Sequence, residues 1–160
     1  MTMDDSTQTD FTGKADAAAE STARMSWLGP EVDQARYQRG AEVLASVDGE
    51  GGQGVVDALA DIAPALAHHV VAYGFGDVYA RPALAPVQRQ LVTLGILTAL
   101  GGCEPQLDVH INASLNVGLS PVEIVEAITH AAVYCGFPKA LNAIFVAKRV
   151  FAHRDLLPVH

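Results

Sequence analysis

Apolar residues recur at helical spacing along most of the chain, and no segment shows the strict alternation that is typical of a half-buried strand. The pattern predicts helices over residues 33–47, 55–80, 87–100, 104–117, 120–134 and 138–153. We expect the second of these helices to be interrupted near Pro64 and near Gly74-Phe-Gly76. The sequence therefore predicts an all-α fold, a compact bundle of about six to seven helices.

Polar and glycine-rich positions predict where these helices begin and end. Asp33 is placed to cap the first helix, and residues 48–54, with four glycines, predict a loop after it. Ser120-Pro-Val-Glu123 has the pattern of a capping box with proline at the first helical position. Beyond Thr93 the helix over residues 87–100 is apolar on nearly every side, which predicts a central, buried helix.

Residues 1–32 differ from the rest of the chain, because five acidic residues stand before Pro30 among Ser, Thr, Gly and Ala. We expect an N-terminal acidic arm over 1–32 and one helical domain over 33–160. Within the arm, Met25-Ser-Trp27-Leu28-Gly-Pro30 contains the single Trp of the chain. This segment is either an anchor that packs on a domain or an exposed apolar spot in a flexible arm.

Charge narrows the classes of partner. The chain has 160 residues, 10 Lys plus Arg against 18 Asp plus Glu, and a net charge of -8, the wrong sign for binding nucleic acid or an anionic membrane. Only 18% of the residues are charged, which suggests that part of the surface is buried in an oligomer. The first residues lack an apolar signal segment and the two cysteines make no disulfide framework, so we expect a cytoplasmic protein.

Five segments, taken together and in order, resemble the carboxymuconolactone decarboxylase family. They cover about residues 35–152 and read Arg36-Tyr-Gln-Arg-Gly40, Gly76-Asp-Val-Tyr-Ala-Arg-Pro-Ala-Leu84, Arg89-Gln-Leu-Val-Thr-Leu94, His110 with Asn116-Val-Gly118, and Tyr134-Cys-Gly-Phe-Pro138. The resemblance implies an alkylhydroperoxidase D-like helical fold that assembles as a homotrimer or homohexamer. It also implies a lyase of aromatic catabolism that removes carbon dioxide from 4-carboxymuconolactone.

This implied reaction does not require a cofactor. The carboxylate leaves the γ-carbon of an unsaturated lactone, so its electrons flow through the double bond into the lactone carbonyl. The protein then has to supply donors for the oxyanion, cations for the carboxylates and an acid for the ring carbon. We therefore expect a small anionic lactone or carboxylate as substrate, no cofactor and no metal, and the chain lacks the usual phosphate-loop and metal motifs.

The candidate catalytic residues are His110, Arg81 and Asp77. His110 lies at the edge of the apolar stripe of its helix, where a histidine can be a packed core residue; its match to the functional histidine of the family favours a general acid/base. Arg81 stands in a proline-bounded break, and its forked guanidinium suits a carboxylate. Asp77 stands where the family commonly has an acidic residue, to polarise His110 or to hold Arg81.

The candidate substrate-binding residues are Tyr79, Arg89 and Tyr134. Tyr79 replaces a Trp that related decarboxylases often carry, which leaves room for a differently shaped substrate. Arg89 is either a second carboxylate ligand or the ion-pair partner of Asp77 or Glu104. Tyr134 adjoins the Gly136-Phe-Pro138 signature.

Three alternatives remain open. The chain can be a relative recruited to another transformation, for instance in a biosynthetic pathway, because a family constrains its substrate only loosely. It can be a thiol redox protein that uses Cys103, although Gln106 stands where the peroxidase branch of the fold has its resolving cysteine. It can also be a non-catalytic oligomeric binding module.

Overall fold

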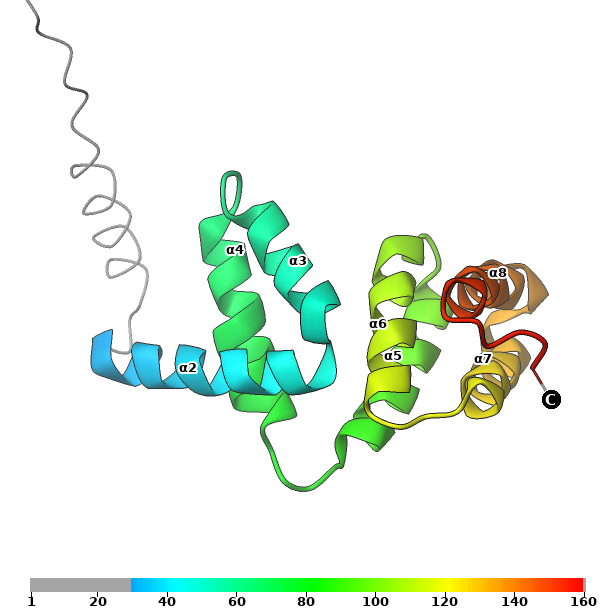
Figure 1. Ribbon diagram of the computed structural model, residues 1–160, viewed down its shortest axis with the longest axis horizontal. Coiled ribbons are helices and arrows are strands. Elements are labelled where there is room, and N and C mark those ends of the chain that lie inside the picture. Colours follow the sequence, from blue (N-terminus) through cyan, green and yellow to red (C-terminus); the bar gives the residue numbers. More distant parts are fainter. Residues whose placement is uncertain (1–29, 160) are drawn as a thin grey trace, which may run out of the picture.

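The computed structural model describes residues 30–159, which contain seven α-helices, one π-helix and no strand (Figure 1). The predicted all-α class is therefore confirmed for this part of the chain. In order, the elements are α2 (Pro30–Val47), α3 (Gly49–Leu59), α4 (Pro64–His69), the π-helix η1 (Val70–Tyr79), α5 (Pro86–Leu100), α6 (Glu104–Asn116), α7 (Pro121–Cys135) and α8 (Phe137–His153).

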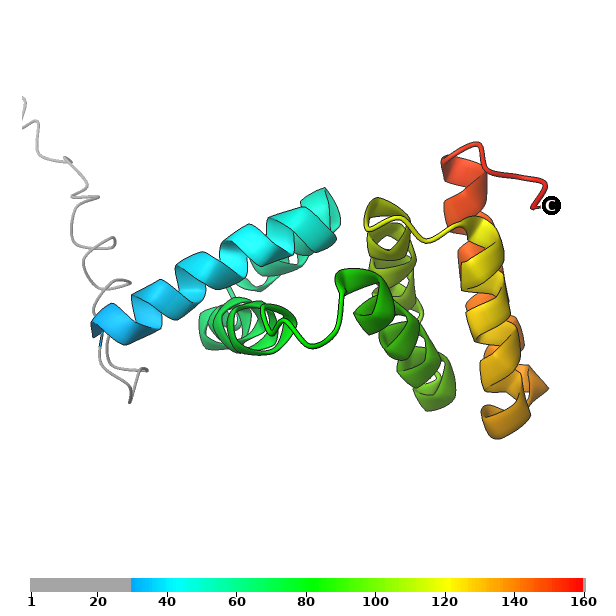
Figure 2. The same cartoon turned by 90° about the horizontal axis from the view of Figure 1, so that it is seen from below.

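The helices form two groups that meet at α6. The first group is α2, α3, α4 and η1, and Figure 2 shows α2 crossing the segment that α4 and η1 make together, which this view shows nearly end-on. The second group is α5 to α8, whose core contains Leu94, Leu107, Ile128, Val146 and Phe151. The core of the first group includes Ala113 of α6, so this helix contributes to both cores.

The first group depends on a close crossing of α2 over η1. A Cβ atom built on Gly40 would overlap the carbonyl oxygen of Val71, and one built on Gly76 would overlap that of Arg36. The absence of side chains at these two glycines therefore lets the two backbones touch. Beside the crossing, the Arg36 guanidinium donates to both carboxylate oxygens of Asp77.

The predicted loop over residues 48–54 is wrong, because helix α3 begins at Gly49. Glycine is a poor helix former, which is why the sequence favoured a loop. A Cβ on Gly52 would come within 2.7 Å of the side chains of both Asp48 and Leu44, so this buried glycine permits tight packing of α3 on the end of α2. Tertiary packing overrides the local propensity here.

The start of α2 and the path of the next segment also differ from expectation. Asp33 is not a cap, since α2 begins at Pro30; its carboxylate pairs with Arg36 and with His68. The expected interruption at Pro64 is confirmed, because this residue begins α4. The expected break at Gly74-Phe-Gly76 is wrong: the chain stays helical there with π geometry, in which the Ala80 N–H donates to the Phe75 carbonyl at 3.0 Å.

Helix α5 is not buried on all sides, contrary to prediction. Among the described residues it buries only Gln90, Leu94 and Thr98, while Val87 and Leu97 are half-buried. Its other large apolar side chains, Leu91, Val92, Ile96 and Leu100, are exposed. Ile96 and Leu100 are 54% and 63% exposed. An isolated chain thus leaves an apolar face in solvent.

The remaining helix boundaries follow the sequence. The Ser120 hydroxyl accepts from the Glu123 N–H, and the Glu123 carboxylate accepts from the Ser120 N–H at 2.8 Å, which confirms the capping box. Gly136, with φ at 84°, separates α7 from α8.

Residues 1–29, which include the Trp27 segment, lie outside the described residues, so the acidic arm stays a prediction. No helix within 30–159 has the length and apolar character needed to cross a membrane. The expected cytoplasmic location also stays a prediction.

We predict that Gly76→Ala lowers the free energy of unfolding by about 1 to 3 kcal/mol, because the added methyl group overpacks the crossing. Gly74→Ala is the matched control. A Cβ at Gly74, in the same helix, meets no described atom within 4 Å, so this change should be neutral or stabilise by up to about 1 kcal/mol. Urea unfolding of both variants measures the difference; equal stabilities would contradict the role of the crossing.

Candidate functional site

A cavity of about 230 Å³ lies where the first helix group faces α6. Its walls come from the end of α2, from α3, from η1 and from the first two turns of α6. Most of the lining is apolar, and the polar side chains are those of Asp48, Gln106 and His110. The full lining is Leu44, Asp48, Gly52, Val55, Val70, Phe75, Pro105, Gln106, Val109 and His110.

His110 is the predicted catalytic residue that the structure places in this cavity. Its imidazole Nδ1 lies 3.2 Å from Oε1 of Gln90, a fully buried residue of α5. Because an amide oxygen only accepts, this contact holds a proton on Nδ1 and leaves Nε2 with a free lone pair. Burial lowers the pKa of His110, so the ring is neutral at pH 7.

Asp48 is the second titratable residue of the cavity lining, and the sequence analysis did not select it. It precedes α3 at the N-cap position, yet its carboxylate accepts no hydrogen bond from that helix. The residue is only 5% exposed, and its Oδ1 atom has no partner among the described residues. Burial raises the pKa of Asp48 to about 6, because removing water penalises the carboxylate.

The placement of Asp48 is costly for the local structure. An aspartate that caps a helix stabilises it by about 0.5 to 2 kcal/mol, and this one gives up that contribution. A buried carboxylate without a partner also destabilises the fold. Such an arrangement is typical of functional sites, where residues are held in unfavourable environments by the surrounding structure.

Arg81, Tyr79 and Arg89 form a second cluster beside the break between η1 and α5. The Arg89 guanidinium donates to the Arg81 carbonyl at 2.9 Å and lies over the Tyr79 ring, 5.7 Å from its centroid. The Tyr79 hydroxyl is 3.1 Å from that of Thr93, and burial raises the pKa of Tyr79. The side chain of Arg81 is exposed, and none of these residues lines the cavity.

Asp77 is held by other partners than those expected. Its carboxylate pairs with Arg36 and Arg39, so the expected contact with Arg81 or His110 is not found within residues 30–159. Hydrogen bonding to Arg36 lowers the pKa of Asp77. Nor does Arg89 pair with Asp77 or Glu104 in this part of the chain; its observed partners are a backbone carbonyl and an aromatic ring.

Tyr134 lies elsewhere, 77% exposed at the end of α7. With the neighbouring ring of His130 it lines a separate apolar groove of about 460 Å³ between α5 and α7. The structure thus does not bring Tyr134 to His110.

The two cysteines are free thiols. Cys103 donates weakly to the Gly101 carbonyl at 3.5 Å and Cys135 to the Gly136 carbonyl at 3.8 Å. The structure therefore contains no disulfide between them.

Sequence reasoning missed two polar groups around His110, Asp48 and Gln90; it considered Gln106 only at the position of a resolving cysteine. Asp48 carried a usable signal, because an acidic residue stands there directly after an apolar helix face. Interpreting the following glycines as a loop hid it. Gln90 carried none, since a glutamine in the polar first turns of a helix is ordinary.

Comparison with known proteins identifies several relatives. The family model described as "Carboxymuconolactone decarboxylase family" matches residues 64–149. The 4-carboxymuconolactone decarboxylase of Acinetobacter baylyi is 33% identical over 127 residues, which are 79% of this chain and 94% of that protein.

Two further relatives match shorter stretches. The nitrosuccinic acid decarboxylase npaB of Metarhizium robertsii is 36% identical over 80 residues, which are 50% of this chain and 55% of that enzyme. An uncharacterized 15.0 kDa protein of Paracoccus denitrificans is 29% identical over 99 residues, which are 61% of this chain and 74% of that protein.

We predict that Asp48 makes the fold less stable as pH rises. Between its unfolded pKa of 3.8 and its folded pKa of about 6, the native state binds more protons than the unfolded state, so the free energy of unfolding falls with pH in this window. A pKa shift of this size corresponds to a loss of about 3 kcal/mol in the free energy of unfolding across the window. Asp48→Asn removes the effect.

Urea unfolding at pH 4 and pH 7.5 measures this prediction. Between pH 4 and pH 7.5, the free energy of unfolding of Asp48→Asn should rise by about 3 kcal/mol relative to that of the wild type. The control is Asp57→Asn, because Asp57 is exposed on α3 and bonded to Gln53. If Asp48→Asn and Asp57→Asn show the same pH dependence, Asp48 is not a desolvated carboxyl.

Proposed function

Because the chain belongs to the carboxymuconolactone decarboxylase family, we propose that it is a cofactor-independent decarboxylase with the His110 cavity as its active site. Its substrate in this proposal is 4-carboxymuconolactone or a similar unsaturated lactone or β-keto carboxylate. The observation that carries the proposal is the apolar cavity in which a neutral histidine and a buried carboxyl both face a space for a small molecule.

The size of the cavity fits a small metabolite. Pockets for drug-sized ligands have volumes of about 300 to 1,000 Å³, and this one has about 230 Å³. A single lactone ring with short substituents suits such a space. Apart from Asp48 and His110, the cavity lining carries no charged or titratable side chain, so a carboxylate that enters it loses hydration.

Loss of hydration suits decarboxylation. The negative charge of the carboxylate spreads into the rest of the substrate as carbon dioxide leaves, so an apolar wall penalises the ground state more than the dispersed charge. In an unsaturated lactone the electron pair passes through the double bond to the carbonyl oxygen. The protein then needs to hold the ring and return a proton to carbon.

We assign the roles as follows. His110 is the general acid/base of the cavity, oriented by Gln90. Arg81, exposed in the break before α5, attracts and orients the anionic substrate outside the cavity, and Arg89 holds the backbone of that break. Tyr79 supports Arg89 by its ring face. Asp77 serves this arrangement indirectly, through its pairs with α2.

The substrate can differ from that of the Acinetobacter relative. The Metarhizium relative is named for nitrosuccinic acid, a dicarboxylic acid with a nitro group, and a nitro group also accepts an electron pair. A carboxylate next to a built-in electron acceptor is common to both compounds. A recruited role on another substrate of this class, in catabolism or biosynthesis, remains within the proposal.

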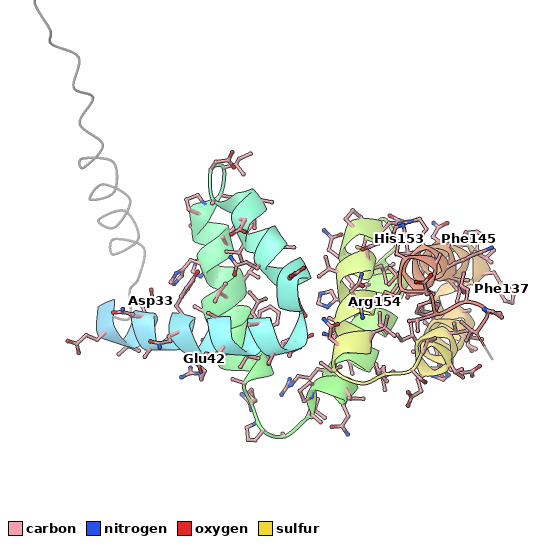
Figure 3. All side chains as sticks on the ribbon, in the orientation of Figure 1. Asp33, Glu42, Phe137, Phe145, His153 and Arg154 are labelled. Atoms are coloured by element: carbon pink, nitrogen blue, oxygen red, sulfur yellow. The ribbon has the colours of Figure 1, made fainter. Side chains whose placement is uncertain are left out.

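We further propose that the enzyme is a homotrimer or homohexamer that covers the exposed face of α5 and the neighbouring face of α7. Leu91, Val92, Ile96 and Val133 are exposed on these faces. Exposed apolar surface of this extent marks an interaction site in soluble proteins. Phe137 and Phe145 lie at the end of the molecule away from α2 and extend the apolar exposure to α8 (Figure 3).

The activity is tested by carbon dioxide release from 4-carboxymuconolactone. His110→Gln should lower kcat by about 10² to 10⁴-fold, because it removes the imidazole, one of the two titratable groups of the cavity, and keeps a side chain of similar size. Arg81→Gln should instead raise KM with a smaller change in kcat.

The control is His153→Gln, an exposed residue at the end of α8, which should match the wild type (Figure 3). If the wild-type enzyme releases no carbon dioxide from this lactone or from a panel of β-keto and nitro dicarboxylates, the proposed activity is wrong. Unchanged turnover in His110→Gln sinks the assigned role of His110.

The oligomer is tested with Ile96→Glu, which places a charge on the exposed face of α5. Light scattering after size-exclusion chromatography should give three or six chains for the wild type and a smaller species for the variant, because burying an unpaired charge in an interface is costly. Glu42→Gln, at an exposed position of α2 away from both faces, is the control (Figure 3). A wild-type mass of a single chain would contradict the proposal.

A further inference from the structure

Asp48 is the cavity group that the proposed mechanism has not used. The last turn of α2 carries it to the junction with α3, where a capping aspartate would turn onto the first N–H groups of the next helix. It accepts no bond from them, and its side chain lines the cavity instead. Gly52 keeps this position open, because a Cβ there would lie 2.7 Å from the Cβ of Asp48.

The two other aspartates near the α2–η1 crossing are satisfied by cations. Asp33 pairs with Arg36 and His68, and Asp77 pairs with Arg36 and Arg39. Asp48 differs because its buried Oδ1 has no hydrogen-bond partner within residues 30–159. A protonated carboxyl is the form that such a dry position favours.

His110 by itself is a poor proton donor to the cavity. The neutral imidazole has one proton, and the Gln90 oxygen engages it at Nδ1. The Nε2 atom then carries a lone pair and can only accept. Yet the proposed reaction requires a proton at the substrate carbon once carbon dioxide has left.

We propose that Asp48, in its protonated form, is the acid that delivers this proton in place of His110, which remains the hydrogen-bond acceptor of the same cavity. This inference rests on the proposed decarboxylase function. The carbon–carbon bond to the carboxylate breaks and carbon dioxide leaves, while the electron pair moves through the double bond to the carbonyl oxygen. The enolate then takes the proton of Asp48 at carbon, and the Asp48 carboxylate regains a proton from solvent.

The charge of the substrate assists this step. A carboxylate that enters the cavity beside Asp48 disfavours a second negative charge, so substrate binding promotes protonation of Asp48. Of the titratable groups around Asp48, His110 from α6 lines the same cavity and is neutral, and Tyr79 from η1, whose pKa is raised by burial and also by the Asp48 charge, remains neutral at pH 7 as well. From α3, Glu50 is exposed and lines no part of the cavity.

The pH dependence of kcat/KM tests the inference in the wild-type enzyme. Burial raises the pKa of Asp48 to about 6, and the acid acts only while protonated, so kcat/KM should fall about tenfold per pH unit well above that value. A wild-type kcat/KM that stays constant from pH 5 to pH 8 overturns the proposal, whatever the variants do.

Asp48→Asn provides the second test, with 4-carboxymuconolactone as the substrate. This variant should lower kcat about 10² to 10³-fold and change KM less than threefold. Its kcat/KM should no longer decline above pH 6. In D2O the wild type should place deuterium on one face of the ring carbon, whereas Asp48→Asn should place it on both faces, because water then protonates the released enolate. A purely structural role of Asp48 would not change this stereochemistry.

The controls separate the two proposals. Asp57→Asn, on the exposed side of α3, should keep wild-type rates. Asp48→Glu should keep part of the kcat that Asp48→Asn loses, and its kcat/KM should again decline at high pH. If the wild type and Asp57→Asn are both inactive on every carboxylate of the panel, the decarboxylase function fails and this inference fails with it. If both are active and Asp48→Asn keeps their kcat, pH profile and stereochemistry, only the role of Asp48 is wrong.

Discussion

Backbone meets backbone where α2 crosses η1, because Gly40 and Gly76 carry no side chains that would hold the two helices apart. The pairs of Asp77 with Arg36 and Arg39 lie on the same crossing and brace it by charge. Partly exposed pairs of this kind contribute little stability individually. Their position next to a close backbone contact makes them determinants of the angle and register of α2 rather than large sources of stability.

The site follows from that register. Helix α2 ends at Val47, so its position decides where Asp48 lies and which wall α3 contributes. The opposite wall belongs to α6, whose place in the second core is independent of α2. His110 is thereby presented by a rigid helix and Asp48 by a helix end, and the cavity between them is polar only where these side chains and Gln106 enter it. This arrangement puts two groups with shifted pKa values into one small apolar space, as acid–base sites require.

The sequence predicted the helical class and most helix boundaries, because apolar periodicity and capping residues act locally. His110 was selected for its match to the functional histidine of the family, and its catalytic role stays a proposal. It failed where tertiary contacts decide. The glycines of α3 suggested a loop, although Gly52 is needed for packing; the apolar positions of α5 suggested burial, although Ile96 faces solvent in the single chain. The family-like Asp77 looked catalytic because a pattern of residues does not show which cation an acid contacts. Asp48 became visible only through its burial and missing partner.

The central claim is that the cavity between Asp48 and His110 holds the substrate, and a crystal structure of the slow His110→Gln variant with 4-carboxymuconolactone tests it most directly. The account predicts the lactone ring between the Asp48 carboxyl and the side chain at position 110, with its carboxylate against the apolar wall. Lactone bound instead in the α5–α7 groove beside His130 and Tyr134, with the cavity filled only by water, would contradict the account.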